Sequence, residues 1–167
     1  MSGCYRLRES KRRRRNALRT YGTFSGDFRP LPTLWRRRYV PVLKSFDYAV
    51  IRVVPRVERE EFLNAGVVLF CLERRFLQAR VHVQEERLRV LWPQLDIEVV
   101  RRHLQAFVKV CQGDAQAGPI ALLSQRERFH WVVAPRSTMI QVSSVHSGLC
   151  DDPEVALEQL FRQLVEE

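Results

Sequence analysis

The sequence predicts an α+β domain: a mainly antiparallel sheet of about five strands, with two main helices packed on one face, in the order β-β-β-α-β-β-α. Five runs of apolar, aromatic and β-branched residues have the length of strands, and they fall at 46–54, 67–72, 76–83, 129–134 and 138–143. Apolar residues recur at helical spacing over 97–111 and again over 157–165. The links between successive strands are short, which favours antiparallel pairing.

Size and composition allow one folded domain. The chain has 167 residues, of which 46% are hydrophobic and 10% aromatic, so it can bury a sizeable core. We find no internal repeat. The domain is expected over residues 45–167, preceded by a separate basic arm over residues 1–44.

Local patterns predict the first three strands. Residues 46–54 (FDYAVIRVV) are rich in β-branched and aromatic side chains, and Pro55 is expected to end the strand. The unbroken apolar run 67–72 is typical of a central strand that is covered on both faces. Residues 76–83 alternate apolar and polar side chains, which predicts a half-exposed strand paired with 67–72 in a hairpin.

Capping residues predict the ends of the two main helices. Asp96 can accept hydrogen bonds from the first turn of a helix whose apolar face covers 97–111, and Gly113 stands where that helix should stop. Asp152 followed by Pro153 predicts the start of the last helix, because proline lacks an N–H that the first helical position does not use.

The remaining elements are less regular. Residues 85–91 predict a short helix. Residues 129–134 are interpreted as a strand closed by Pro135, residues 138–143 as the next strand, and residues 144–151 as a loop. Phe129 and Trp131 would then belong to the core of the sheet.

The arm carries the whole positive excess of the chain. Residues 1–44 hold 13 Lys and Arg against 2 Asp and Glu, a net +11, whereas residues 45–167 hold 15 against 17, a net −2. One interpretation is an electrostatic clamp on nucleic acid, with aromatic side chains of the arm stacking on bases. The other is a disordered extension, translated from a start placed too far upstream. Nucleic-acid binding is therefore predicted only through residues 1–44.

Cysteine usage and hydropathy exclude several classes of protein. The cysteines at 4, 71, 111 and 150 have neither the spacing of a zinc site nor that of a disulfide framework, so we expect no metal, no cofactor and a reducing, cytoplasmic location. The longest apolar run, 67–72, is too short to cross a bilayer, and no membrane partner is expected. Arg outnumbers Lys by 25 to 3, which favours a bacterial protein from a GC-rich genome.

The strongest candidate for a ligand-binding site lies in the stretch 127–152. Its residues carry hydrogen-bond donors near a predicted strand turn and the loop that follows: Arg128, Arg136, Ser137, Thr138 and His146. Such a group can grip a phosphate or carboxylate, since arginine offers a planar fork of donors to paired oxygens. Alternatively, these side chains satisfy the backbone of the turn and pair with Glu127 or Asp151. Both interpretations stay open.

A second group of candidate ligand-binding residues is Arg52 and Asn64, with Glu61 beside them. Glu61 and Asn64 flank the entry to the central strand, where side chains can project at a sheet end. Glu61 is expected to pair with Arg52, or with Arg136 if the strands bring them together, because a buried charge needs a partner. Gly66 is expected to allow a bulge or a close approach of two backbones.

A catalytic role is the less favoured hypothesis, and whether the protein is an enzyme stays open. Its candidate residues are His146, Glu61 and Asp151, since an imidazole can transfer protons together with a carboxylate. The sequence contains no G-x-S-x-G elbow, no P-loop and no G-x-G-x-x-G fingerprint.

Three segments closely resemble domain-of-unknown-function family 3037 (DUF3037), a bacterial family: 48–54 (YAVIRVV), 55–70 (PRVEREEFLNAGVVLF) and 127–160 (ERFHWVVAPRSTMIQVSSVHSGLCDDPEVALEQL). The resemblance covers about residues 46–165, and Ala65 stands where such sequences usually have valine. It implies a small cytoplasmic domain without an assigned activity, catalytic residue or cofactor. It also implies a partner or regulator role beside a kinase-like neighbour, and it favours the misplaced-start interpretation of the arm.

We therefore expect a non-enzymatic binding or regulatory module. It would recognise an unknown protein partner or an anionic ligand through Arg128, Arg136, Ser137 and His146. The first alternative is a hydrolase or nuclease-like enzyme that uses His146 with an acidic residue. The second is nucleic-acid binding through the basic arm.

Overall fold

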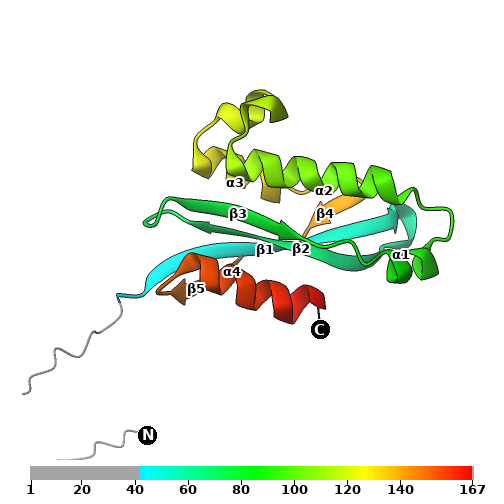
Figure 1. Cartoon of the computed structure of the whole chain (residues 1–167), viewed down its shortest axis with the longest axis horizontal. Helices are drawn as coiled ribbons and strands as arrows, with labels where there is room; N and C mark the ends of the chain where they lie inside the picture. Colours follow the sequence, from blue (N-terminus) through cyan, green and yellow to red (C-terminus); the bar gives the residue numbers. More distant parts are fainter. Residues whose placement is uncertain (1–41, 167) are drawn as a thin grey trace, which may run out of the picture. The chain divides into compact units, whose positions relative to one another are not determined.

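A five-stranded antiparallel sheet forms the centre of the domain in the computed structural model, which describes residues 42–166 (Figure 1). The strands follow the order β3-β2-β1-β4, and β5 pairs with β1 beside β4. Their bounds are β1 Lys44–Arg56, β2 Glu61–Cys71, β3 Phe76–Val81, β4 Ile140–Val142 and β5 His146–Cys150. The fold class is α+β, as the sequence predicts.

Four α-helices accompany the sheet in the described residues: α1 Glu85–Leu91, α2 Ile97–Gln112, α3 Gln125–Val133 and α4 Pro153–Phe161. Single 3-10 turns lie at Val57–Arg59 (η1), Ala115–Ala117 (η2) and Pro119–Leu122 (η3), and a π-helical turn (η4) follows α4 at Arg162–Glu166. The predicted caps are confirmed, since Asp96 and Asp152 accept from first-turn N–H groups of α2 and α4. Gly113 ends α2 in the left-handed conformation.

The meander β1-β2-β3 confirms the first three predicted strands, although β1 and β2 are longer than expected. The register of β1 and β2 shifts where Ile51 faces Gly66 but Arg52 faces Asn64, so that Ala65 is an extra residue. A Cβ atom on Gly66 would lie 2.6 Å from the Arg80 carbonyl oxygen, so only glycine fits this approach of β2 to β3. The bulge and the close approach expected at Gly66 are both present.

β4 and β5 share one side of β1. β4 pairs with Ile51–Val53 and β5 with Lys44–Tyr48. Ser143 joins them: its N–H donates to the Val50 carbonyl at 2.9 Å, and its hydroxyl accepts from the Val50 N–H at 2.9 Å. The residues expected to form a loop at 144–151 thus contain a strand, because pairing with β1 holds them extended.

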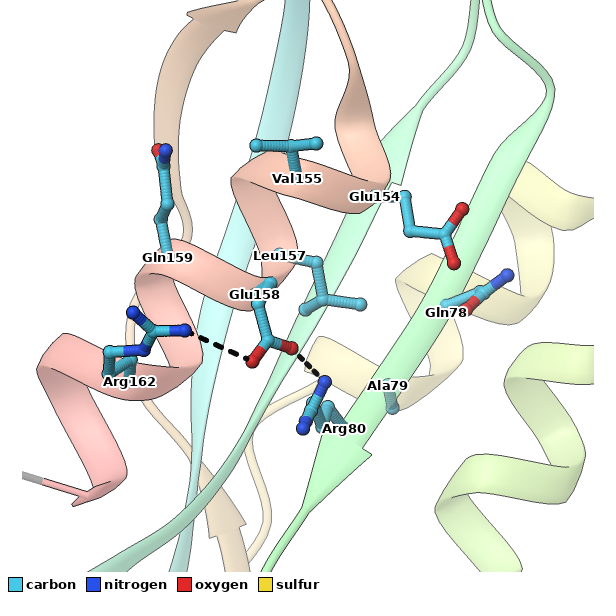
Figure 2. A pocket seen from close by; sticks show the side chains of 9 residues that line it. All are labelled: Gln78, Ala79, Arg80, Glu154, Val155, Leu157, Glu158, Gln159 and Arg162. Carbon is cyan, nitrogen blue, oxygen red and sulfur yellow. Dashed lines mark hydrogen bonds and ion pairs between the residues drawn. The ribbon is translucent and has the colours of Figure 1, made fainter.

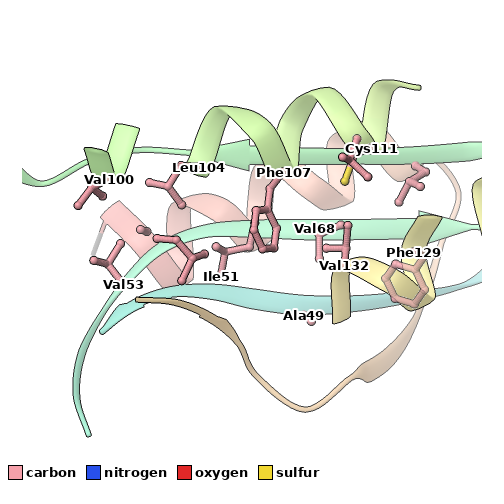
Figure 3. Packing of buried hydrophobic residues seen from close by; sticks show 14 of the residues in the cluster. Ala49, Ile51, Val53, Val68, Val100, Leu104, Phe107, Cys111, Phe129 and Val132 are labelled. Atoms are coloured by element: carbon pink, nitrogen blue, oxygen red, sulfur yellow. The ribbon is translucent and has the colours of Figure 1, made fainter. Parts of the chain in front are cut away.

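Helices cover both faces of the sheet. On one face, α2 and α3 pack on side chains such as Ile51, Val53 and Val68 (Figure 3). The other face is covered by α4 (Figure 1), which packs on Val67 and Leu69 of β2. The expectation that both main helices lie on one face is therefore wrong. The apolar run in β2 alternates between the two faces, so each face needs its own cover.

The strand expected at 129–134 is also wrong, because these residues belong to α3. Ser124 caps this helix: its hydroxyl accepts from the Glu127 N–H, and the Glu127 carboxylate accepts from the Ser124 N–H at 3.0 Å. Trp131 consequently lies on a helix with 37% of its surface exposed, rather than in the core of the sheet. The observed order is β-β-β-α-α-α-β-β-α.

Two findings concern only the residues that the structure describes. Within 42–166, every helix is too short or too polar to span a bilayer. Residues 1–41, which make up nearly all of the expected basic arm and carry the nucleic-acid hypothesis, lie outside the described residues.

Candidate functional site

Arg136 lies just beyond the C-terminal end of α3 and turns back onto it. Its Nε donates to the Ala134 carbonyl at 3.3 Å, and its Nη2 donates to the Trp131 carbonyl. Carbonyl groups at the end of a helix carry a partial negative charge, so they favour a cation at this position. The guanidinium is thereby held in one orientation.

Two aromatic rings flank this guanidinium. The Arg136 Cζ lies 4.6 Å from the centre of the Trp131 ring and 5.2 Å from that of Phe107. Both distances lie within the range of cation–π attraction. Desolvation by this partial burial lowers the pKa of Arg136 from its ordinary value, yet arginine keeps its proton in proteins. A fixed positive charge therefore stands at the surface here.

Arg136 has no acidic partner among residues 42–166, since none of the ion pairs found there involves it. Most other arginines with a fixed orientation do have one, such as Arg59 with Glu61 and Arg89 with Glu85. The guanidinium is thus free to pair with an anion from outside the domain.

A pocket of about 260 Å³ opens beside the Phe107 and Trp131 rings on which Arg136 lies, between α2 and β4. Its lining is almost wholly apolar and consists of His103, Ala106, Phe107, Trp131, Thr138, Met139 and Ile140. Small-molecule sites usually measure ~300–1,000 Å³, so this pocket suits a single ring or one apolar side chain. Ser137 is exposed nearby in sequence, and the Thr138 hydroxyl donates to the Ile140 carbonyl at 2.7 Å.

Of the candidate ligand-binding residues, this site brings together Arg136 and Thr138, with Ser137 between them in the chain. The sequence interpretation missed Trp131, Phe107 and the other apolar lining residues, because it placed Trp131 on a strand. The Ser124-x-x-Glu127 capping box was the signal that could have found the helix, and with it the exposed ring.

Arg128 is buried elsewhere, between α3 and the end of α2. Its Nη1 donates to the carbonyls of Val110 at 3.1 Å and Cys111 at 3.2 Å, which are among the last of α2. It also packs against Gly113, where an added Cβ would overlap the guanidinium. These partners all belong to the fold, so the geometry gives Arg128 a capping role.

Arg52 and Asn64 lie on the opposite face of the sheet from Arg136. They face each other across β1 and β2, and the Asn64 amide donates to the Leu164 carbonyl at 2.9 Å, on the side of α4 and η4. Arg52 stacks on the exposed Phe62 ring, with its Cζ 4.2 Å from the ring centre. Arg52 Nε and Asn64 Oδ1 are buried and lack hydrogen-bond partners in the described chain.

The three catalytic candidates are far apart. His146 pairs with Tyr48 in the β1–β5 register, whereas Glu61 pairs with Arg56. Eight residues of β1 separate these positions, which is about 26 Å at the rise of a strand. The His146 ring lies against the Tyr48 ring at a tilt of 33°, with ring centres 5.3 Å apart.

Both carboxylates already have basic partners. Glu61 pairs with Arg59 at 2.6 Å, rather than with Arg52 or Arg136 as expected. Asp151 lies 3.6 Å from Arg74. In residues 42–166, no group of His, Cys, Asp and Glu side chains is arranged to hold a metal ion. The structure therefore does not assemble these three residues into one cleft.

A second groove, of about 660 Å³, lies between α4 and β3 (Figure 2). Glu158 at its centre pairs with Arg80 on the strand and lies 3.8 Å from Arg162 on the next helical turn. Arg80 also lies over the Phe161 ring, at 4.8 Å. Both arginines of this groove thus lie close to a carboxylate, whereas Arg136 has no acidic partner among residues 42–166.

Comparison with known proteins gives one match. The model of a family described as "Protein of unknown function (DUF3037)" matches residues 48–165. No curated protein and no solved structure matches the chain.

Proposed function

The chain belongs to the DUF3037 family, and we propose that it is a non-enzymatic binding module whose site is the pocket beside Arg136. A ligand for this site carries an apolar group next to an anionic one. The apolar group fills the pocket under Phe107 and Trp131, and the anion pairs with the guanidinium.

One observation carries this proposal: a fixed, partly buried guanidinium lies against Phe107 and Trp131, two rings that line an apolar pocket, and it has no acidic partner among residues 42–166. Pairing it with a carboxylate would form charge-assisted hydrogen bonds, which are stronger than neutral ones. Exposed aromatic rings and arginines are also the side chains enriched at protein interfaces and at their energetic centres.

The alternative of a hydrolase or nuclease-like enzyme receives less support. It needs His146 close to a free carboxylate, and the separation of about 26 Å along β1 argues against Glu61 in that role. Asp151 is engaged with Arg74.

The test uses a small probe, 3-phenylpropionate, together with its neutral analogue 3-phenylpropan-1-ol. We expect the carboxylate to shift the NMR signal of the Trp131 indole N–H with a dissociation constant on the order of 1 mM, which corresponds to about 4 kcal/mol. The alcohol should bind more weakly. A Trp131→Phe spectrum assigns the signal.

A matched pair of variants controls the experiment. Arg136→Gln should weaken carboxylate binding about tenfold, whereas Arg126→Gln, at an exposed arginine in the first turn of α3, should leave it unchanged. Thermal melting of both variants checks that they fold. Equal binding of acid and alcohol, or equal loss in both variants, would contradict the proposal.

A further inference from the structure

We propose that the natural ligand of the Arg136 pocket is an extended polypeptide segment of a partner protein, which adds to the sheet as a strand beside β4. This inference rests on the proposed function and specifies its partner class. It follows from the position of the pocket between a helix and an edge strand.

β4 is an edge strand in the described part of the chain. It pairs with β1 on one side, and the sheet order β3-β2-β1-β4 ends there. Hydrogen bonding to β1 continues one residue beyond each of its bounds, because Val54 N–H donates to the Met139 carbonyl at 2.7 Å, although Met139 lies in a bend, and Ser143 N–H donates to the Val50 carbonyl at 2.9 Å. A stretch of five residues, 139–143, therefore follows β1.

The direction of the free backbone groups follows from these bonds. Met139 and Ser143 direct their main-chain groups toward β1. Gln141 lies two residues from each of them and faces Arg52, so its main-chain groups also point toward β1. In an antiparallel ladder, neighbouring residues alternate, so Ile140 and Val142 direct their N–H and C=O groups away from β1. The Thr138 hydroxyl occupies one lone pair of the Ile140 carbonyl. Both N–H groups and the Val142 carbonyl are left for another strand.

The pocket lies where such a strand would run. Met139 and Ile140 line it from the sheet, while Ala106 and Phe107 line it from α2. Ile140 and Val142 direct their side chains toward the core under α2, and an added strand repeats this alternation. One of its apolar side chains then enters the pocket, and an acidic side chain two residues away, which points to the same face, reaches Arg136. Helix and edge strand together thus form a groove for strand addition.

The other edges of the sheet lack these features. Beside β3, the Gln125 amide donates to the Arg75 carbonyl of the preceding turn at 2.8 Å, and Arg80 of the strand is paired with Glu158. The groove beside β5 is lined by Asp151 and Asp152 and by no basic residue. Only at β4 do the described residues combine free main-chain groups, an apolar pocket and an unpaired cation.

The first experiment identifies a peptide and then tests its backbone. The full chain selects binders from a phage-displayed library of random linear peptides about 12 residues long, which exceeds a typical strand of 5–6 residues. We expect the enriched peptides to share an apolar residue near Asp or Glu. One synthetic peptide of this set is then N-methylated at one residue at a time. Methylation should lower the affinity about tenfold at every second residue, whose N–H points toward β4, and should have little effect at the residues between.

The second experiment removes the donor from the protein. Val142→Pro deletes an N–H that points away from β1, and proline is tolerated on edge strands at such positions. This substitution should lower the affinity for the peptide fivefold or more. Val142→Thr keeps both the N–H and the branched side chain, so it should leave the affinity unchanged. If Val142→Pro does not fold, the N-methyl scan alone decides.

The outcomes separate this inference from the proposed function. A flat N-methyl scan, a library without enriched binders, or a peptide unaffected by Arg136→Gln overturns strand addition at β4. Binding of 3-phenylpropionate can persist in all three cases, and the proposed function then stands without the inference. Loss of 3-phenylpropionate binding together with an alternating N-methyl scan and a sensitive Val142→Pro variant would instead overturn the small-ligand mode alone.

Discussion

Gly113→Ala should destabilise the domain by about 3 kcal/mol, although it adds only one methyl group. Gly113 ends α2 with φ of 77° and ψ of 32°, a left-handed conformation that costs an alanine ~1–2 kcal/mol. The new Cβ would also overlap Arg128 Nη1 and lie 3.1 Å from its Cζ. The buried guanidinium must then shift and weaken one of its bonds to the Val110 and Cys111 carbonyls, at a further cost of ~1.5–3 kcal/mol.

A double-mutant cycle separates the two terms. Arg128→Met removes the guanidinium but keeps a long apolar side chain, so Gly113→Ala in this background should cost only the conformational ~1–2 kcal/mol. The coupling between the two positions is then about 2 kcal/mol. Urea unfolding followed by tryptophan fluorescence measures all four proteins, with the slope of the free energy against urea unchanged.

The reasoning fails if the two substitutions prove additive. In that case Arg128 does not occupy the space beside Gly113, and its role as a cap of α2 would be refuted. A cost of Gly113→Ala below about 0.5 kcal/mol would refute the left-handed C-cap itself.

Three further predictions follow from the packing and charges of the domain. A Cβ on Gly148 would lie 2.6 Å from Cζ of the buried Phe46 ring, so Gly148→Ala should lower the melting temperature measured by calorimetry by about 5 °C. Substitution of the exposed Ser144 in the nearby loop, Ser144→Ala, should leave it within about 1 °C. Burial raises the pKa of Cys111 to about 12, so iodoacetamide should label this thiol only after the protein unfolds, as peptide mapping of the labelled protein can show. Because the folded pKa lies above the ordinary value of 9.0, the contribution of this thiol to stability is present below pH 9.0 and is lost as the pH rises toward about 12. Glu158→Gln should change the free energy of unfolding by less than about 0.5 kcal/mol in a urea titration, because the ion pairs of Glu158 are exposed. A loss above about 1 kcal/mol would show that the ion pairs in the groove of Figure 2 stabilise the fold.

The elements that sequence predicts well are those whose ends carry their own signals. Asp96 and Gly113 bracket α2, and Asp152 with Pro153 starts α4, because capping depends on residues next to the helix. β5 has no comparable signal. Its sequence, His146–Cys150, lacks an apolar pattern, and pairing with a distant segment of β1 holds it extended.

The helix α3 was missed because two local signals disagreed. The run Phe129–Val133 is aromatic and β-branched, which favours a strand, whereas Ser124 and Glu127 form a capping box, which favours a helix. Packing decides between them: the Phe129 ring stacks on Phe70, with centres 5.1 Å apart, and Val132 is fully buried against the sheet.

The candidate site was predicted only in its polar half for the same reason. Arg136, Ser137 and Thr138 are recognisable as a polar turn in the sequence, but their apolar neighbours come from α2 and from the helical form of α3. Trp131 reaches Phe107 and Arg136 only because α3 is a helix. Distances across the sheet, such as that between His146 and Glu61, likewise depend on strand register rather than on spacing in the chain.

Ser143 has a consequence for how the domain behaves at high concentration. A continuous strand from β4 through β5 would offer a long, flat row of free backbone groups, which is a template for edge-to-edge aggregation. The Ser143 hydroxyl instead takes the Val50 N–H and donates to its neighbour's carbonyl at 2.8 Å, so the edge is interrupted after five residues. We therefore expect this single serine side chain to favour the docking of one short segment over the pairing of whole sheets edge to edge.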